Sequence, residues 1–344
     1  MKPSCFIVPP SVLEALSTHE AGRIQGPAGR TLDEMRRIEH HRAAPRGTPV
    51  AHEHRLVYDC KHQKELPGAL RRREAQPPCD DADVNRAYDA AGTTYDFYRT
   101  VFGRDSVDGH GKHLISSVHY DEKFDNAYWD GTQMVYGDGD GVVFAPFTGF
   151  LDVIAHELTH AVIYNETRLG YEGEAGALNE SLADVFGSLV KQWVQHETAA
   201  KADWLIAKGL FLPPIHAKAL RSLAAPGTAF NDMKFGLHDN QPAHMRDFVT
   251  DPSADPVHAN SGIPNHAFYL FAKDLGGHAW ETAGRIWYDT MCTGLREDCT
   301  FAMFAAQTLF VAEQHGATTF DALARAWRKV GVLQKKRSHL TATV

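Results

Sequence analysis

The segment Asp152–Val162, which reads DVIAHELTHAV, constrains the chain more than any other feature of its sequence. His156 and His160 are four residues apart, so on a helix they lie on one face, one turn from each other, and both can reach one metal ion. Glu157 projects near the same face, where it can accept a proton from a metal-bound water without ligating the metal. The pattern also occurs by chance on helices that bind nothing, so it needs a further ligand.

A second helix supplies that ligand. Glu180 follows His160 by twenty residues and stands near the start of an apolar-periodic stretch, Asn179–Gly187. Two imidazoles and one carboxylate leave the fourth tetrahedral position open for water, which is typical of catalytic rather than structural zinc. We therefore predict one catalytic Zn²⁺ bound by His156, His160 and Glu180, with Glu157 as the general base.

Two polar side chains on this second helix are predicted to orient the metal-binding histidines. Asp184 lies one turn after Glu180 and could accept the remaining ring proton of His156. Asn179 could do the same for His160. Such partners fix the histidine tautomer and raise its basicity as a ligand. The alternative for Asp184 is a carboxylate on the helix surface.

Composition limits the other possibilities. A chain of 344 residues with 43% hydrophobic and 23% charged residues is typical of a globular protein with about two domains, each large enough for its own core. The sequence has no run of about 18 apolar residues, which argues against a membrane span. A net charge of −8 without a Lys/Arg-rich block argues against nucleic acid as a partner. We expect a monomer.

The five cysteines leave the redox state open. Cys60 could pair with Cys79 and Cys292 with Cys299, which would leave Cys5 over, although three pairings of those four are possible. The alternative is five reduced thiols in a cytosolic protein. The N-terminus lacks the apolar core and small-residue cleavage site of a signal peptide. We therefore expect either secretion without an ordinary signal peptide or a cytoplasmic location.

Residues 1–50 are predicted to form a removable pro-segment, with an ordinary N-terminal arm as the alternative. Pro9 and Pro10 favour an extended conformation and remove two backbone donors. Residues 43–49 are rich in proline and glycine, which is typical of an exposed linker where proteolysis concentrates. We expect the cut near residues 45–52.

The hydrophobic pattern predicts an α+β protein in three parts. These are the pro-segment with its linker over 1–50, a β-rich lobe over 51–165 that ends in the HExxH helix, and an α-helical lobe over 166–344. Thr31 and Glu34 have the spacing of a capping box. The expected elements are strands at Arg55–Asp59, Leu114–Tyr120 and Gln133–Tyr136, and helices at Val12–His19, Thr31–His40, Asp81–Gly103, Asn265–Leu275, Trp280–Thr290, Thr300–His315 and Thr319–Val330.

The order of these motifs resembles the thermolysin family of neutral zinc metallopeptidases over most of residues 55–332. Besides the two metal segments, the blocks that carry the resemblance are Leu66–Gly68, Asn126–Trp129, Met134–Gly141, Leu220–Ser222 and His258–Ile263. The resemblance implies a two-lobe fold, β-rich then α-helical, with a zinc cleft between the lobes. The short leader, with Cys5 ahead of Pro9 and Pro10, resembles the protealysin branch, whose precursors have a brief propeptide.

The resemblance also implies roles for side chains far from the metal segments. His258 and Tyr171 correspond to the family's two donors to the oxyanion of the tetrahedral intermediate. A carboxylate normally orients this histidine, and neither Asp255 nor Asp251 has the family's spacing from it. Our candidate is Asp255.

Three further positions correspond to substrate-binding residues of the family. Asn126 and Ala127 match the edge strand that pairs with an extended peptide. Arg221 matches the residue that holds the substrate carbonyl just beyond the scissile bond by a bidentate contact. The alternative for Arg221 is a surface ion pair. The family prefers a bulky hydrophobic residue on the amino side of the cut bond.

One departure from the family concerns calcium. Asp152 matches one carboxylate of the family's paired calcium site, but Lys191 stands where a glutamate ligand is expected. Two further ligand positions correspond to Leu205 and Lys208. A lysine beside Asp152 would supply positive charge without an ion, so we predict that the paired calcium site is absent.

These observations predict a zinc endopeptidase made as a zymogen, acting on peptide or protein substrates and blocked by its own propeptide. A Cys5 thiolate could serve as the fourth zinc ligand, or the prolines alone could exclude substrate. The alternative function is a catalytically latent regulatory or binding protein on the same fold. An aminopeptidase is a third class, but the sequence lacks its Gly-x-Met-Glu-Asn pattern.

Overall fold

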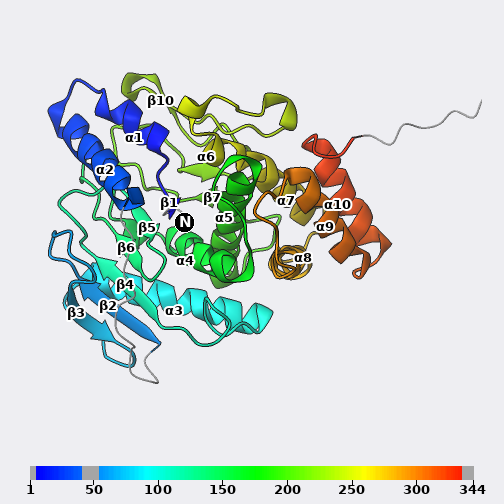
Figure 1. Ribbon diagram of the computed structural model, residues 1–344, viewed down its shortest axis with the longest axis horizontal. Coiled ribbons are helices and arrows are strands. Elements are labelled where there is room, and N and C mark those ends of the chain that lie inside the picture. The colour runs from blue at the N-terminus through cyan, green and yellow to red at the C-terminus, as the bar shows by residue number, and fades with distance from the viewer. Residues whose placement is uncertain (1–4, 41–53, 335–344) are drawn as a thin grey trace, which may run out of the picture.

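The computed structural model describes residues 5–40 and 54–334 (Figure 1). The expected cleavage region at residues 45–52 lies outside the described residues. Among the helices in the described ranges, none is long and apolar enough to span a bilayer.

The described chain contains ten α-helices, ten strands and four short 3₁₀ helices at Phe147–Gly149, Met233–Phe235, Met245–Asp247 and Pro252–Ala254. The helices are α1 (Pro10–Ser17), α2 (Gly22–His40), α3 (Ala82–Phe102), α4 (Leu151–Glu166), α5 (Gly173–Gln195), α6 (Pro256–Asn260), α7 (Gly262–Leu275), α8 (Thr282–Met291), α9 (Phe301–Glu313) and α10 (Ala317–Lys329). The strands are β1 (Cys5–Phe6), β2 (Arg55–Asp59), β3 (Ala69–Arg73), β4 (Leu114–Val118), β5 (Ala127–Trp129), β6 (Met134–Tyr136), β7 (Leu205–Ile206), β8 (Arg221–Ser222), β9 (Asn231–Asp232) and β10 (Leu237–His238).

A mixed six-stranded sheet in the order β1-β5-β6-β4-β2-β3 forms the N-terminal lobe. The pairs β2–β4 and β4–β6 are parallel and the others are antiparallel. A parallel pair requires a crossover connection, and α3 supplies it between the β2–β3 hairpin and β4. The leader contributes β1, which occupies the edge of the sheet beside β5.

The two metal-motif helices, α4 and α5, lie side by side at the centre of the molecule (Figure 1). Every residue of α4 from Asp152 to Ile163 is buried, because α3 and β5 cover one side while α5 covers the other. The helix backbones approach closely at Gly187, where an added Cβ would lie 2.6 Å from the carbonyl oxygen of Asp152. A side chain at Gly187 would therefore force the helices apart.

Helices α7 to α10 belong to the C-terminal lobe and pack around a buried aromatic cluster. Trp287 stacks on Trp327 at a centroid distance of 5.9 Å, and Phe268 meets Trp287 edge-on at 4.9 Å. The four helices expected in this part of the sequence are confirmed, each within a few residues of its predicted bounds. The α+β, two-lobe prediction is also confirmed.

Two predictions for the leader were wrong. Helix α2 begins at Gly22, not Thr31, so Thr31 and Glu34 lie inside it and form no capping box. The Thr31 hydroxyl instead accepts the backbone N–H of Asp125 at 3.0 Å. Of the two prolines expected to be extended, only Pro9 is, with φ −58° and ψ 142°, whereas Pro10 is the first residue of α1.

All five cysteines are unpaired in the structure, although each lies within the described ranges. The geometry therefore agrees with the reduced-thiol alternative, and the Cys60–Cys79 and Cys292–Cys299 pairings are not formed.

Candidate active site

Helices α4 and α5 bring three candidate ligands together. The Nε2 atoms of His156 and His160 are 3.0 Å apart. The two carboxylate oxygens of Glu180 lie 3.5 Å from Nε2 of His156 and 3.6 Å from Nε2 of His160. All three side chains are at most 3% exposed. Four donor atoms thus converge on one small, water-excluded point.

The predicted orienting residues contact the far side of each imidazole. Nδ1 of His156 donates to Asp184 at 2.9 Å, and Nδ1 of His160 donates to Asn179 at 2.9 Å. These bonds leave both Nε2 lone pairs directed at the common centre. Asp184 is fully buried, so it is not the surface carboxylate of the alternative interpretation.

The residues present fit a metal ion. Oε2 of Glu180 and Oε1 of Glu157 are buried and have no hydrogen-bond partner among the described residues. An unpaired buried carboxylate oxygen is costly. Two imidazole nitrogens and a carboxylate match the donor set of a catalytic Zn²⁺, which would satisfy these groups.

Glu157 lies next to this centre without joining the ligand set. Its Oε2 accepts the backbone N–H of Trp129 at 3.1 Å, which fixes the side chain against β5. Burial raises the pKa of Glu157 to about 8. A carboxylate whose pKa is close to neutral can both accept a proton and release it, as a general base must.

His258, in the short helix α6, faces the same centre from the C-terminal lobe. Its Nδ1 donates to Asp255 at 2.8 Å, so Asp255 is its carboxylate partner. Asp251 bonds Ser253 instead. Burial opposes the charge on His258, but Asp255 and Glu180 outweigh it and raise its pKa to about 9. The histidine is therefore a charged donor at neutral pH.

Tyr171 completes this side of the site. Burial raises the pKa of Tyr171, and the neighbouring Cys5 adds to this rise, so the phenol keeps its proton and can donate it in a hydrogen bond. Cys5 in turn lies with His160 and Glu180 in a group whose donor atoms are all within 4.8 Å of one another. The leader thus places a sulfur atom against the metal-binding centre.

Arg221, on β8, is buried at 2% exposure and is no surface ion pair. Its Nε and Nη2 donate to the carboxylate of Asp184, and its Nη1 donates to the carbonyl oxygen of Ile7 at 2.8 Å. Asn265 also donates to Asp184, at 2.9 Å. One carboxylate therefore joins a metal-site histidine to the arginine that holds the leader.

The leader follows β5 through the predicted substrate-binding residues. The backbone N–H of Val8 donates to Oδ1 of Asn126 at 2.9 Å, and Nδ2 of Asn126 donates back to the Val8 carbonyl at 3.0 Å. The N–H of Ile7 donates to the carbonyl of Ala127 at 3.1 Å. Ile7 and Val8 are fully buried.

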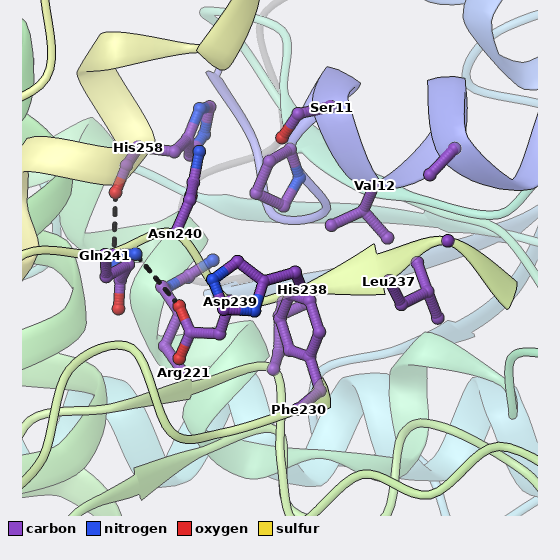
Figure 2. A pocket seen from close by; sticks show the side chains of 14 residues that line it. Ser11, Val12, Arg221, Phe230, Leu237, His238, Asp239, Asn240, Gln241 and His258 are labelled. Atoms are coloured by element: carbon purple, nitrogen blue, oxygen red, sulfur yellow. Dashed lines mark hydrogen bonds between the residues drawn. The ribbon is translucent and has the colours of Figure 1, made fainter. Parts of the chain in front are cut away.

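Beyond Pro9, α1 covers the C-terminal lobe but does not fill the space beneath it. A cavity of about 100 Å³ lies between Val12 of α1 and Arg221, Phe230 and His258 of the lobe. Figure 2 shows the side chains that line it. Gln241, at its base, donates from its side-chain amide to the carbonyl of His258 at 2.9 Å. The cavity is part of the cleft that holds the leader, and Arg221 lines it.

The sequence interpretation missed a second contact between leader and body. Glu34 of α2 is 1% exposed and accepts hydrogen bonds from Tyr120 and from Lys64, both at 2.7 Å. Arg37, one turn along α2, also pairs with it. The capping-box interpretation paired Glu34 with Thr31 inside the leader, so it gave no signal for this contact with the body.

Lys191 lies where the calcium prediction placed it. Its ammonium is 3.0 Å from Asp152 and 3.2 Å from Asp203, and it also donates to the carbonyl of Leu205. Burial opposes its charge, but the two carboxylates raise its pKa. The ammonium of Lys208 lies nearer the surface, 3.5 Å from a carboxylate oxygen of Asp203.

Comparison with known proteins adds two family matches and several relatives. The family described as thermolysin metallopeptidase, catalytic domain, matches residues 53–164, and the thermolysin metallopeptidase alpha-helical domain matches residues 167–332. An extracellular metalloprotease of Pectobacterium carotovorum subsp. carotovorum is 44% identical over 338 residues, which cover 96% of this chain and 97% of that protein. Protease PrtS of Photorhabdus sp. (strain Az29) is 45% identical over 292 residues, which cover 82% and 77%.

A solved structure is also similar. It is the precursor of protealysin, a metalloproteinase from Serratia proteamaculans, with 45% identity and a TM-score of 0.88. The match covers 96% of this chain and 100% of that one.

Proposed function

Because the chain belongs to the thermolysin family of metallopeptidases and is a zinc endopeptidase made as a precursor, we propose specific roles for its residues. His156, His160 and Glu180 hold the zinc. Glu157 is the general base, and the leader blocks the cleft until it is removed. The observation that carries this proposal is the convergence of four buried donor atoms beside a carboxylate oxygen without a partner.

Bound zinc would lower the pKa of a water molecule and polarise the peptide carbonyl. Glu157 accepts the proton of the attacking water and passes it to the leaving nitrogen. His258 and Tyr171 donate to the oxygen on which negative charge develops. Arg221 binds the carbonyl oxygen of the residue just beyond the cut bond. Asp184 accepts hydrogen bonds from both Arg221 and His156 and so fixes the positions of both side chains.

The substrate class follows from the cleft. The contacts that Asn126 and Ala127 make with the leader are those of a strand added to a sheet edge, so substrates bind extended. We propose a preference for a bulky hydrophobic residue on the amino side of the cut. The apolar side chain of Ile7, fully buried in this cleft, supports that preference.

Cys5 is proposed as the fourth zinc ligand of the precursor. Its sulfur belongs to the group formed with His160 and Glu180. In the absence of metal, burial and the nearby carboxylates raise the pKa of this thiol. Bound zinc would favour the deprotonated thiolate of Cys5. With Cys5, His156, His160 and Glu180 as ligands, a four-coordinate zinc would have no position for water, and the precursor would be inactive.

A cleavage assay tests the proposed function. The chain without residues 1–50, loaded with one zinc per molecule, is expected to cut a model peptide before leucine or isoleucine. The same peptide with glycine at that position should be cut about 10–200-fold less efficiently, since a hydrophobic pocket loses one to three kcal/mol. Equal kcat/KM for both peptides, or cleavage after the residue, would contradict the proposed specificity. The latent-protein alternative predicts no cleavage.

The paired calcium site is proposed to be absent, with Lys191 in its place. A calcium-specific chelator should then leave the melting temperature unchanged, because only a bound ligand stabilises the folded state. Lys191→Met should destabilise the protein by roughly 3–5 kcal/mol, since Asp152 would remain as a buried charge without an opposite charge beside it. Lys208→Met is the matched control, because its side chain is 63% exposed. A calcium-dependent rise in the melting temperature of the wild type would contradict this account.

We expect the leader to bind the body more weakly at acidic pH, because the Glu34 carboxylate is then protonated. Burial raises the pKa of Glu34, but hydrogen bonds from Arg37, Lys64 and Tyr120 outweigh it and lower the pKa to about 2. A depressed folded-state pKa adds stability that is fully present above the ordinary value near 4.5 and is lost as the pH falls towards 2. The precursor's melting temperature should therefore fall more steeply over this range than that of Glu34→Gln. Glu39→Gln is the control, and parallel curves for wild type and Glu34→Gln would contradict the prediction.

A further inference from the structure

The leader lies in the cleft in a defined register. Five backbone groups set this register. The Phe6 carbonyl accepts from Nε2 of His258 at 3.1 Å, the Ile7 N–H donates to Ala127, and the Ile7 carbonyl accepts from Arg221. The N–H and the carbonyl of Val8 both bond the side chain of Asn126. Each contact is made by a residue of the body that the proposed function assigns to substrate binding or to oxyanion stabilisation. The register can therefore be compared with that of a substrate.

The comparison places one peptide bond at the reactive position. His258 donates to the carbonyl that is attacked, and this is the carbonyl of Phe6. Arg221 holds the carbonyl just beyond the cut, and this is the carbonyl of Ile7. The bond between Phe6 and Ile7 thus lies where a substrate would be cleaved. Ile7 also supplies the bulky hydrophobic residue on the amino side.

The sulfur of Cys5 lies where the fourth zinc ligand is expected. Cys5 is 5% exposed, and its Sγ lies with the donor atoms of His160 and Glu180. A thiolate at the fourth position excludes the water that hydrolysis needs. The leader has the backbone contacts and the side chain of a substrate, but no nucleophile can reach it.

We propose that the Phe6–Ile7 bond is a latent self-cleavage site and that Cys5 makes the leader an inhibitor instead of a substrate. This inference rests on the proposed function. In the reaction, water adds to the carbonyl carbon of Phe6 and the bond from that carbon to the nitrogen of Ile7 breaks. Glu157 carries the proton from the water to that nitrogen. The products are a carboxylate at Phe6 and an amine at Ile7.

The test is the intact mass of full-length Cys5→Ser after zinc loading. We expect residues 1–6 to be lost and a new chain to begin at Ile7, at a rate that does not depend on protein concentration, because the leader is cut by its own chain. Cys292→Ser is the matched control, since Cys292 lies on the surface away from the cleft. It should remain uncut at this bond, as should the wild type.

Two further variants identify the cause. Cys5→Ser with Glu157→Gln should stay intact, which shows that any cut made by Cys5→Ser comes from this active site. Cys5→Ser with Ile7→Gly should be cut at least about tenfold more slowly at this bond, since the hydrophobic contact on the amino side is lost. Should Cys5→Ser fold poorly, a synthetic peptide of residues 5–10 with serine at position 5 can be given to the trimmed enzyme, which is expected to cut it after Phe6.

Cobalt in place of zinc gives a readout independent of hydrolysis. In the Glu157→Gln precursor we expect a thiolate-to-cobalt absorption band that disappears when Cys5 is also replaced by serine. An unchanged spectrum would overturn the inference, because Cys5 would then not be a ligand. A Cys5→Ser precursor and a serine peptide that both stay uncut, while the trimmed enzyme cleaves other peptides, would also overturn it and leave the proposed function standing. A trimmed enzyme that cleaves nothing would refute the proposed function itself.

Discussion

Replacing Glu157 by glutamine in the trimmed chain is expected to lower kcat for peptide hydrolysis by about 10²–10⁴-fold, the usual contribution of a positioned general base. The amide has nearly the same size as the carboxylate but cannot accept a proton. Glu157 is not in the ligand set, and its Oε2 bonds only the Trp129 backbone in the described structure. Zinc content, measured by mass spectrometry of the metal, should therefore stay at one per chain.

Two results would count against this role of Glu157. Turnover near the wild-type value would show that another group moves the proton. Loss of zinc would show that Glu157 supports the metal and not the reaction. Glu313→Gln, on the exposed face of α9, is the matched control and should change neither quantity.

The second large effect is expected for His258→Ala. Removing a donor aimed at the oxyanion costs about 10²–10³-fold in kcat, because the interaction is made only in the transition state. KM and zinc content should change little. Asp255→Asn should give a smaller loss, since it leaves the imidazole in place but removes the charge that helps hold the pKa of His258 at about 9.

The pH profile separates the two variants. A histidine that must be charged loses activity as the pH rises through its pKa, so weakening the charge contribution of Asp255 should move this upper limit to lower pH. An unchanged profile in Asp255→Asn, or a rise in KM without a fall in kcat for His258→Ala, would contradict the oxyanion role.

The grouping of the proposed metal ligands was predictable because helical periodicity fixes which residues share a face. His156 and His160 are one turn apart on α4, and Glu180 and Asp184 are one turn apart on α5. Each pair therefore shares a face whatever the tertiary structure. Periodicity alone does not predict that the two helices pack closely together. The absence of a side chain at Gly187 allows this close packing.

The partner of His258 was only partly predictable. Asp255 caps α6 in the left-handed conformation, with φ 48° and ψ 68°, which turns its carboxylate back onto a ring three residues away. A left-handed aspartate is uncommon and has no clear sequence signal here. Hence Asp255 and Asp251 could be ranked from the sequence but not decided.

The path of the leader could not be predicted from local patterns. Its contacts join residues far apart in sequence, such as Phe6 with His258 and Val8 with Asn126. The start of α2 was predicted too far along the chain, at Thr31. The reason is that Gly22, Gly26, Pro27 and Gly29 are of residue types that disfavour helices in isolation. Packing of its apolar side chains on the body outweighs that weak preference.

The most direct measurement of the central claim compares peptide hydrolysis by the full-length chain and by the chain without residues 1–50, at equal zinc content. A tethered segment acts at an effective concentration of about 1 mM, so a leader that binds the cleft with a Kd of about 10 µM or tighter suppresses activity about a hundredfold or more. The account predicts that the trimmed chain is at least that much more active. Equal activity of the two chains, each with one zinc, would contradict it.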